Sequence, residues 1–395
     1  MLVVVPLHGD GSPVTWAGSL SLQAHASGVQ PWRLPHTDAD LLTVAGDELN
    51  TGAVLLDQAG MAAGVRLQLL LAAGTGPISV VVTVAVRRVY SSGHNAELDC
   101  VLDGELVHSA ELVCPEPEHT WGEPQAVTFT LPPAGDSVPR RLELWLPQRY
   151  QVMVMQLTVA GDGASVQKMQ QQAASWTVYG SSITHCGSSG ACYSPSRTWP
   201  ATVARTCDLD LLCLGFGGNC CLDPQIARTI RDLPPQCAIT LKLGINMLAT
   251  HTRRTFVPAA LGFVLTVRDG HPTTPLLVCS PIHCTKRFRS LTTGRLEAQE
   301  TVATVEHGLC LQEMRTALRR LVDSLRQRGD LNVHYLDGQE LLGPDDDTDA
   351  LLPDGTHPSA AGYELIGQRF AELAFGPTGR LRSRSSNTQA ALGKL

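Results

Sequence analysis

The second half of the chain alternates short apolar runs with helix-like segments, and this alternation constrains the fold more than any other feature. Each run has the length of a strand buried on both faces, and helical spacing of apolar residues follows it. Strands that alternate with helices in this way form a parallel, doubly wound sheet. We therefore predict an α/β, flavodoxin-like domain with strands in the runs 175–180, 209–218, 238–246, 274–282 and 331–338.

Local signals indicate where several of the intervening helices begin and end. Asp223 is followed by Pro224, which is a favourable N-cap followed by proline at the first helical position. Gly329 follows the longest helix-like segment and suits a helix C-terminus. A last helix is expected over 359–375. The apolar stripe of the longest segment consists of Met314, Leu318, Leu321, Val322 and Leu325.

The first half has a different pattern, in which β-rich runs are separated by Gly, Pro and Asp turns. Several short strands at this spacing are typical of a β-sandwich. We predict a sandwich similar to a carbohydrate-binding module over 1–168, the α/β domain over 169–376 and a disordered tail over 377–395, with 163–176 as the linker. The expected strands lie in 65–74, 78–90, 96–107, 126–133, 140–148 and 152–161.

The composition argues against several classes of function. The 37 acidic residues outnumber the 30 basic ones, and a formal net charge of -7 disfavours nucleic acid as a partner. No apolar run approaches the roughly 20 residues that a membrane helix needs. The first residues lack the basic start and the cleavage site of a secretion signal. We expect a cytoplasmic protein without a membrane partner.

Twelve cysteines are present, and no pair of them has Cys-x-x-Cys spacing. In a cytoplasmic protein these thiols stay reduced. His185 lies near Cys186 and Cys192, and His283 is next to Cys284, but neither group has the spacing of a zinc site. We therefore expect small buried thiols, no metal and no cofactor.

Four polar or glycine-containing motifs follow the predicted strands. In a parallel sheet, ligands bind outside the carboxyl ends of the strands, so these motifs are expected to meet at one edge. They are Gly180-Ser181-Ser182, Gly217-Gly218-Asn219, Gly244-Ile245-Asn246 and Asp354-Gly355-Thr356-His357.

Taken singly, the last three motifs are each explained better by a structural role than by a chemical one. Asp354-Gly355 is favourable turn chemistry, and glycines at 217 and 218 suit a tight turn. Asn246 could form an Asx turn. Together, the motifs supply a serine, a histidine with a carboxylate and several oxyanion donors, which is what acyl transfer by a serine requires. Their joint occurrence favours the chemical interpretation.

The motifs resemble those of the SGNH, or GDSL-type, serine hydrolases in content and order. That family has a nucleophile in Gly-Asp-Ser-Leu, then a glycine, a Gly-x-Asn and a C-terminal Asp-x-x-His, where this chain has GSSIT, LGFGGN, LGIN and DGTH. The resemblance implies that Ser182 is the nucleophile, His357 the general base and Asp354 its orienting group. It also implies an oxyanion hole made by the N–H groups of Ser182 and Gly218 and the side chain of Asn246.

The match departs from the family pattern at three positions. Ser181 stands where the first motif has Asp, Cys213 where Asn often precedes the glycine motif, and Met247 where many members have Asp. None of these removes a catalytic group, but they leave the hydrogen bonding of the oxyanion hole open. The first half resembles the β-sandwich of one SGNH subfamily through QPWRLPH (30–36) and AELDCVLDGEL (96–106).

These features predict an enzyme that transfers an acyl group through a serine. The favoured acceptor is water, which makes the protein an esterase or acylhydrolase for an ester of a small molecule or sugar. The alternative is an acyltransferase that moves the acyl group from acyl-CoA to a small-molecule hydroxyl. The loop 285–309 could form part of the pocket, and the oligomeric state stays open.

A rival interpretation from another class is a carbohydrate-binding protein with an inactive second domain. Trp32, Trp121 and Trp145 could stack on sugar rings or pack internally. The intact set of Ser, His, Asp and Asn argues against an inactive domain. His185 and Cys186 lie close to the predicted nucleophile, where they either line its pocket or pack in the core.

Overall fold

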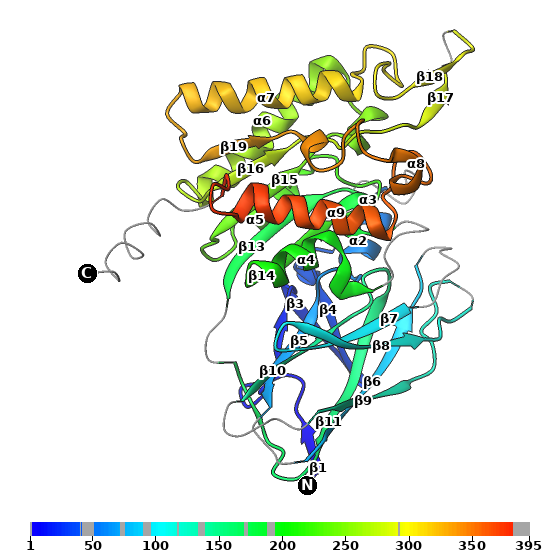
Figure 1. Cartoon of the computed structure of the whole chain (residues 1–395), viewed down its shortest axis with the longest axis vertical. Helices are drawn as coiled ribbons and strands as arrows, with labels where there is room; N and C mark the ends of the chain where they lie inside the picture. The colour runs from blue at the N-terminus through cyan, green and yellow to red at the C-terminus, as the bar shows by residue number, and fades with distance from the viewer. Residues whose placement is uncertain are drawn as a thin grey trace.

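The computed structural model describes residues 2–39, 41, 51–71, 76–89, 96–116, 118–132, 139–169, 173–187, 194–290 and 293–381. In this part of the chain, antiparallel sheets occupy the first half, and a parallel sheet flanked by helices occupies the second (Figure 1). The N-terminal strand lies at the end of the sandwich that is farthest from the helical layers. The predicted fold class is confirmed.

Two sheets pack face to face in the first half and share one apolar core. One sheet has the order β3-β4-β11-β6-β9 with β1 paired to β11, and the other has the order β12-β5-β10-β7-β8 with β2 paired to β5. The first sheet comprises β1 (Leu2–Val5), β3 (Ser21–His25), β4 (Gly28–Trp32), β6 (Ile78–Arg87), β9 (Gln125–Leu131) and β11 (Gln151–Ala160). The second comprises β2 (Thr15–Ala17), β5 (Arg66–Leu71), β7 (Ala96–Leu102), β8 (Glu105–Leu112), β10 (Arg140–Trp145) and β12 (Val166–Gln167).

Five of the six predicted β-rich runs each contain one strand, namely β5, β6, β9, β10 and β11. The run 96–107 contains β7, a turn and the start of β8, so two strands were predicted there as one run. Over residues 78–84 of β6 the side chains alternate between buried and partly exposed, which is the period of two that identified these runs. The helix α2 (Thr51–Ala59) and the short turn η1 (His36–Asp38) were not predicted. The expected linker 163–176 was wrong in part, because it contains β12 and the start of the next strand.

The second half is built on a parallel sheet with the order β14-β13-β15-β16-β19. Its strands are β13 (Ala174–Gly180), β14 (Leu209–Gly215), β15 (Ala238–Lys242), β16 (Leu276–Cys279) and β19 (Val333–Leu336). The strand order reverses at β13, since β14 lies on one side of it and β15 on the other. That switch point is where doubly wound sheets open a crevice for ligands.

Helices cover both faces of the parallel sheet (Figure 1). One face carries α5 (Pro224–Arg231), α6 (Arg253–Gly270) and α7 (Leu311–Gln327), and the other carries α4 (Trp199–Thr206) and α9 (Ala360–Phe370). The remaining elements are α3 (Ser182–His185), η3 (Pro195–Arg197), η4 (Ile245–Leu248), β17 (Arg287–Arg289), β18 (Leu296–Ala298), η5 (Gly338–Glu340), α8 (Thr348–Leu351) and η6 (Ala371–Phe375).

The helix-boundary signals in the sequence agree with the structure. Asp223 is the N-cap of α5 with Pro224 inside its first turn, and Gly329 has a positive φ of 101° just beyond α7. The predicted helix 359–375 begins at the N-cap Ser359 and is divided into α9 and the π-helical turn η6.

Side chains from the two halves share a buried cluster. Trp145 of β10 and Val101 of β7 belong to the same apolar cluster as Trp176 and Trp199 of the second half. The guanidinium of Arg66 lies over the Trp145 ring at 4.8 Å and donates to Asp210 at 2.7 Å. The contact between the halves therefore resembles a core rather than a loose surface contact.

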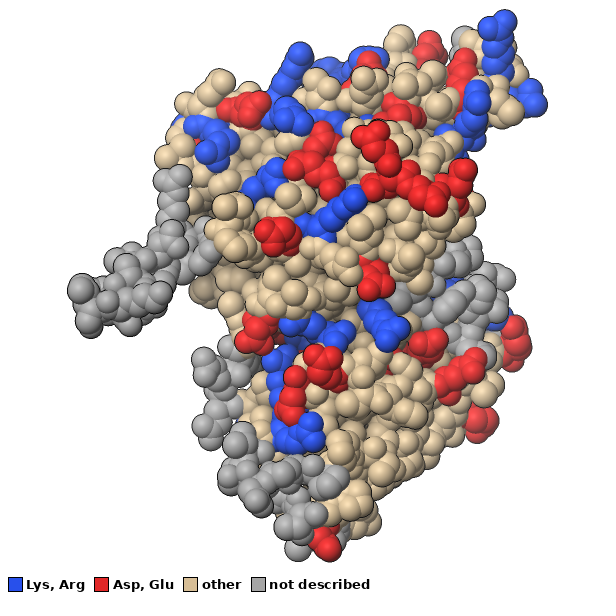
Figure 2. Space-filling model, in the orientation of Figure 1, with Lys and Arg blue, Asp and Glu red and all other residues tan. Residues whose placement is uncertain are grey.

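Charges of both signs are interspersed over the face of the molecule shown in Figure 2. Arg287, Arg289 and Arg295 are exposed in the β17–β18 hairpin, which projects from the second half in Figure 1. In the described part of the chain, no helix is long and apolar enough to cross a membrane.

Glycines end β13 and β14 because the one-turn helix α3 lies directly against both strands. A Cβ atom at Gly215 would lie 2.3 Å from the backbone nitrogen of His185, and one at Gly180 would lie 2.2 Å from the Thr184 hydroxyl. Both distances are far below a normal contact, so only glycine lets α3 approach the sheet this closely.

Gly215→Ala is expected to lower the free energy of unfolding by about 1–3 kcal/mol, because the new methyl group meets backbone atoms that cannot rotate away. Gly262→Ala is the matched control, because Gly262 is exposed in α6 with open space at its Cβ position. Alanine there is expected to add roughly 0.5–1 kcal/mol of stability. Urea unfolding of both variants measures the difference, and equal stabilities would contradict the close approach of α3.

Candidate active site

The two serines after β13 have different roles in the local structure. Ser181 is the N-cap of α3, 1% exposed, and its hydroxyl accepts a hydrogen bond from the Ile183 N–H at 3.3 Å. Ser182 is half-buried and begins the helix. An N–H group in the first helical turn has no acceptor within the helix. Ser182 thus offers both a hydroxyl and an available N–H at the switch point.

Ser182, His357 and Asp354 form a continuous hydrogen-bonded chain. Ser182 Oγ lies 2.9 Å from His357 Nε2, and His357 Nδ1 lies 2.7 Å from Asp354 Oδ2. Because a carboxylate only accepts, Nδ1 carries the ring proton and Nε2 presents a lone pair to the serine hydroxyl. This is the geometry in which a histidine can take the proton of a serine.

The turn that carries Asp354 and His357 is held from two sides. Asp354 Oδ1 accepts hydrogen bonds from the N–H groups of Thr356 at 2.9 Å and His357 at 2.6 Å. The carbonyl of Gly355 accepts from the N–H groups of Thr285 and Lys286 at 2.9 and 3.1 Å. The start of the loop 285–309 therefore buttresses the histidine turn, a role the sequence did not indicate.

Hydrogen bonds stabilise the ionised form of Asp354. Partial burial alone would raise the pKa of its carboxyl group, but the N–H of His357, the His357 ring and the N–H of Thr356 hold the pKa below the usual value. The carboxylate therefore stays ionised at neutral pH, as required of a group that stabilises a protonated histidine.

The segment 216–222 after β14, here called the glycine loop, lies beside the serine. A Cβ atom at Gly217 would be 3.5 Å from the Cβ of Ser182, and Gly218 has a positive φ of 72° that favours glycine. The Asn219 side chain donates to the Gly217 carbonyl at 2.8 Å. The chain thus makes the predicted tight turn, and the turn places Gly217 beside Ser182.

Asn246 follows β15 in η4 and reaches across to the glycine loop. Its Oδ1 accepts a hydrogen bond from the Cys220 N–H at 3.1 Å. Because this contact uses the carbonyl end of the amide, Nδ2 remains as the donor end. The Asx-turn alternative is not what the contact shows, since the partner is 26 residues away.

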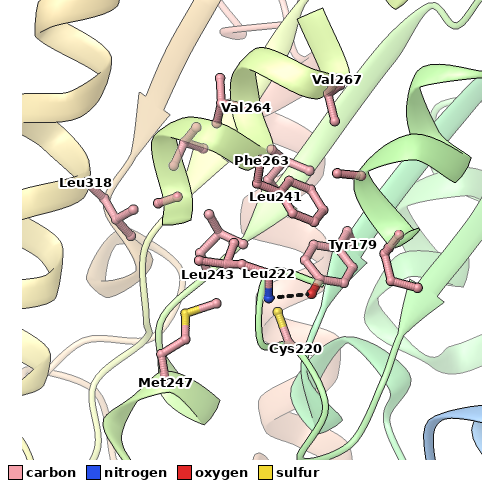
Figure 3. Close-up of a cluster of buried hydrophobic side chains, with 14 of the residues drawn as sticks. Tyr179, Cys220, Leu222, Leu241, Leu243, Met247, Phe263, Val264, Val267 and Leu318 are labelled. Carbon is pink, nitrogen blue, oxygen red and sulfur yellow. Dashed lines mark hydrogen bonds between the residues drawn. The ribbon is translucent and has the colours of Figure 1, made fainter. Parts of the chain in front are cut away.

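Tyr179 supports the glycine loop from inside the core (Figure 3). Its hydroxyl accepts a hydrogen bond from the Leu222 N–H at 3.2 Å, and its ring stacks on Phe263 at a centroid distance of 4.9 Å. Burial raises the pKa of this phenol well above its usual value, so the hydroxyl stays neutral. The loop therefore leaves the sheet over a rigid apolar base.

The partial match Leu98-Asp99-Cys100 contains a buried contact between the two halves. Asp99 is fully buried, and its Oδ2 accepts from the Ser194 hydroxyl at 2.5 Å and from Ser196 N–H and Oγ at 3.0 and 2.7 Å. These serines lie just before α4. A carboxylate surrounded by hydroxyls on another segment gives no signal in a single sequence.

For several residues the sequence left open whether they line a binding site or pack in the core, and three of them pack in the core. His185 and Cys186 are buried, and Cys186 belongs to the shared apolar cluster. Trp145 is 1% exposed and cannot stack on a sugar, whereas Trp32 and Trp121 are half-buried.

No disulfide bond joins the cysteines that the structure describes. In the part of the chain that the structure describes, no group of three or more His, Cys, Asp or Glu side chains could hold a metal ion. Cys192, named with His185 and Cys186 in the sequence, lies outside the described residues.

Comparison with known proteins identifies the family. A model described as the GDSL-like Lipase/Acylhydrolase family matches residues 174–374, about half of the chain. The chain belongs to this family. A second model, described as the N-terminal domain of SsfX3, matches residues 14–155. The resemblance recognised from the motifs is therefore confirmed for both halves.

Solved structures with the same two-part fold are similar over nearly the whole chain. The salicylyl-acyltransferase SsfX3 from a tetracycline biosynthetic pathway is 29% identical, with 100% of this chain and 98% of that chain covered and a TM-score of 0.75. A putative GDSL-like lipase from Bacteroides ovatus is 18% identical, with coverage of 94% and 96% and a TM-score of 0.64. A family two carbohydrate esterase from Clostridium thermocellum is 15% identical, with coverage of 97% and 100% and a TM-score of 0.56. No curated protein sequence matches.

His185 sets a pH dependence of stability close to the site. Its Nε2 donates to the Gln148 carbonyl at 2.7 Å, and burial, reinforced by the charge of Arg33, lowers its pKa from 6.5 to about 3. Between those values the unfolded chain binds a proton that the folded protein does not, so stability falls as the pH falls below about 6.5.

The contribution of His185 to this dependence is expected to approach about 1.4 kcal/mol per pH unit between pH 6 and pH 4. His185→Gln keeps a donor for Gln148 but does not titrate, so its unfolding free energy should have a shallower slope with pH. Urea unfolding at several pH values compares the two proteins. Equal slopes would mean that His185 binds a proton in the folded state.

Proposed function

We propose that the protein is a serine esterase or acylhydrolase that works through an acyl-enzyme on Ser182. The observation that carries the proposal is the chain of hydrogen bonds from Ser182 through His357 to Asp354 at the switch point of the sheet. Membership of the GDSL-like lipase/acylhydrolase family supports it. The substrate class is an ester of a small molecule or a sugar.

In the first step, Ser182 Oγ attacks the carbonyl carbon of the ester, and His357 Nε2 takes the hydroxyl proton. Asp354 stabilises the resulting imidazolium through its hydrogen bond to Nδ1. The imidazolium then gives its proton to the departing alcohol, which leaves an acyl group on Ser182. A water molecule discharges this acyl-enzyme by the same steps in reverse.

The negative charge that develops on the carbonyl oxygen needs donors already in place. In this proposal the donors are the N–H groups of Ser182 and Gly218 and the Nδ2 of Asn246. Such donors act strongly because they need no reorganisation during the reaction, and loss of one typically costs about 10²–10³-fold in kcat. The contact between Asn246 and Cys220 supports this assignment, because it uses the carbonyl end of the amide and leaves Nδ2 as the donor.

A second candidate function is acyl transfer from acyl-CoA to the hydroxyl of a small molecule. The specific observation in its favour is the similarity to a salicylyl-acyltransferase over essentially the full length of both chains. The triad is the same for both reactions, so the acceptor alone distinguishes them. The third interpretation, a carbohydrate-binding protein with an inactive domain, is weakened because Trp145 is buried and the triad is hydrogen-bonded.

Mixing the protein with p-nitrophenyl acetate is expected to give a transient acetyl adduct, detected by intact-protein mass spectrometry. Ser182→Ala should give no adduct, because it lacks the attacking oxygen. Ser181→Ala is the matched control and should still be acetylated, since Ser181 Oγ caps α3. An adduct that persists in Ser182→Ala would reject Ser182 as the nucleophile.

The acceptor is identified by the product of the acetylated protein. If water is the natural acceptor, added small alcohols are expected to leave acetate as the main product, measured by NMR. If the protein is a transferase, an acceptor hydroxyl should give mainly its acetyl ester and should accelerate the loss of the adduct. Dominant ester formation at millimolar alcohol would overturn the hydrolase proposal in favour of the second candidate.

A further inference from the structure

Arg33 joins the first half of the chain to the strand that leads into the glycine loop. It follows β4 and is fully buried. Its Nε donates to the Met61 carbonyl at 2.7 Å, and its Nη1 donates to the carbonyls of Cys213 and Gly215, both at 2.8 Å. A further hydrogen bond runs from Nη2 to the carbonyl of Gln58. The guanidinium thus ties together backbone segments from both halves.

The two carbonyls from the second half lie at the carboxyl end of β14. Gly215 is the last residue of that strand, and the next residue, Phe216, lies under the guanidinium at 4.8 Å from its ring centroid. Arg33 therefore determines the direction in which the chain leaves the sheet toward Gly217. A buried guanidinium is costly unless its donors are satisfied, so its contacts are expected to be held firmly.

Gln58 continues the same contact into the glycine loop. It lies in α2, is 2% exposed, and donates from Nε2 to the Gly217 carbonyl at 2.7 Å. A Cβ atom at Gly217 would be 3.5 Å from the Ser182 Cβ and 3.7 Å from Gln58 Oε1. Gly217 is therefore enclosed between the serine and a side chain from the first half.

Because a peptide unit is planar, the hydrogen bond from Gln58 to the Gly217 carbonyl also fixes the direction of the Gly218 N–H. The carbonyl of Gly217 and the N–H of Gly218 belong to one planar trans peptide, so they point in opposite directions. When Gln58 holds the carbonyl on one side, the Gly218 N–H is directed to the other side. Any rotation of this peptide would turn the N–H away and expose the carbonyl oxygen to a developing negative charge.

We propose that Arg33 and Gln58 are positioning residues that hold the Gly217–Gly218 peptide so that the Gly218 N–H faces the reacting carbonyl oxygen. The first half of the chain thereby completes the oxyanion hole without touching the substrate. This inference rests on the proposed function, since it assigns Gly218 as an oxyanion donor. The inference concerns only the orientation of the Gly217–Gly218 amide, and it requires no additional chemical group.

Arg66 also joins the two halves, but it bonds β14 away from the glycine loop. It is also buried, comes from the first half, and donates to the Leu211 carbonyl of β14 at 3.3 Å and to Asp210 at 2.7 Å. Leu211, its carbonyl acceptor in β14, lies four residues before Gly215 and away from the carboxyl end of the strand. Removal of Arg66 should weaken the contact between the halves without rotating the Gly217–Gly218 peptide.

The test compares Arg33→Met and Gln58→Ala with two matched controls in the full chain. Arg66→Met removes a buried arginine that bonds β14 elsewhere, and Gln151→Ala removes a glutamine that donates to Asp57 of α2 at 3.0 Å. Steady-state hydrolysis of p-nitrophenyl acetate gives kcat and KM, and thermal melting reports folding. Hydrogen exchange of the peptide 214–222 reports the order of the loop.

Gln58→Ala is expected to lower kcat by roughly 10-fold and Arg33→Met by up to about 100-fold, with KM nearly unchanged, because a misplaced donor weakens only the transition state. The smaller effect is expected for Gln58 because Asn219 also holds the Gly217 carbonyl. The pH profile of kcat/KM should keep its shape, since His357 and Asp354 are untouched. Exchange in 214–222 should rise in these two variants and not in the controls.

The inference is overturned if kcat of Gln58→Ala equals that of Gln151→Ala, or if the loss appears in KM. If Arg33→Met does not fold, Gln58→Ala decides, because that variant keeps the backbone carbonyl that Arg33 contacts. Failure of the proposed function is a separate result. In that case the native protein itself forms no adduct on Ser182, whatever the variants do.

Discussion

The site depends on how closely one turn of helix can approach the ends of two parallel strands. Ser182 can meet His357 only because α3 lies against β13 and β14, where Gly180 and Gly215 leave no room for a Cβ atom. The same approach leaves Ser181 to cap the helix and places the Ser182 N–H in the free first turn. The glycine loop then passes so near the serine that a Cβ atom at Gly217 would be in contact with it. The polar contacts of the site therefore depend on a steric condition, which is the absence of a side chain at Gly180 and Gly215.

Polar contacts between the halves are buried, and burial makes them specific. Arg33, Arg66 and Asp99 are each at most 1% exposed, and each is bonded to the other half. A buried charge without partners is strongly destabilising, so alternative arrangements of the halves that separate these groups carry a large cost. Apolar packing of Trp145 with the second half supplies the general attraction. The polar contacts select one orientation, and that orientation is what the glycine loop requires.

Periodicity and local turn chemistry were enough to predict the elements whose signals lie within a single segment. The parallel strands, the sandwich runs and the capping of α5 are of this kind. The pairing of Asp354 with His357 could be expected from their spacing, and the structure gives it as a 2.7 Å contact. Arg33 and Gln58 could not be found in this way, because they bond across the chain, over as many as 182 residues, to backbone carbonyls that carry no sequence signal. Asp99 could not be found because its serine partners before α4 lie 95 and 97 residues away. The helix α2 was missed because tertiary contacts such as that of Gln58 hold it in place, and its sequence has no strong helical pattern.

Solvent exposure of the triad bears on the choice of acceptor. The side chains of His357 and Asp354 are 23% and 46% exposed, so the outer end of the triad is open to water. If Ser182 carries an acyl group as proposed, water reaches this acyl-enzyme unless another molecule occupies that side, and hydrolysis needs no additional binding site. A transferase built on the same groups must let its acceptor displace this water before the acyl group is lost. The balance between the two reactions is then a property of acceptor binding above the triad, and the triad itself is common to both.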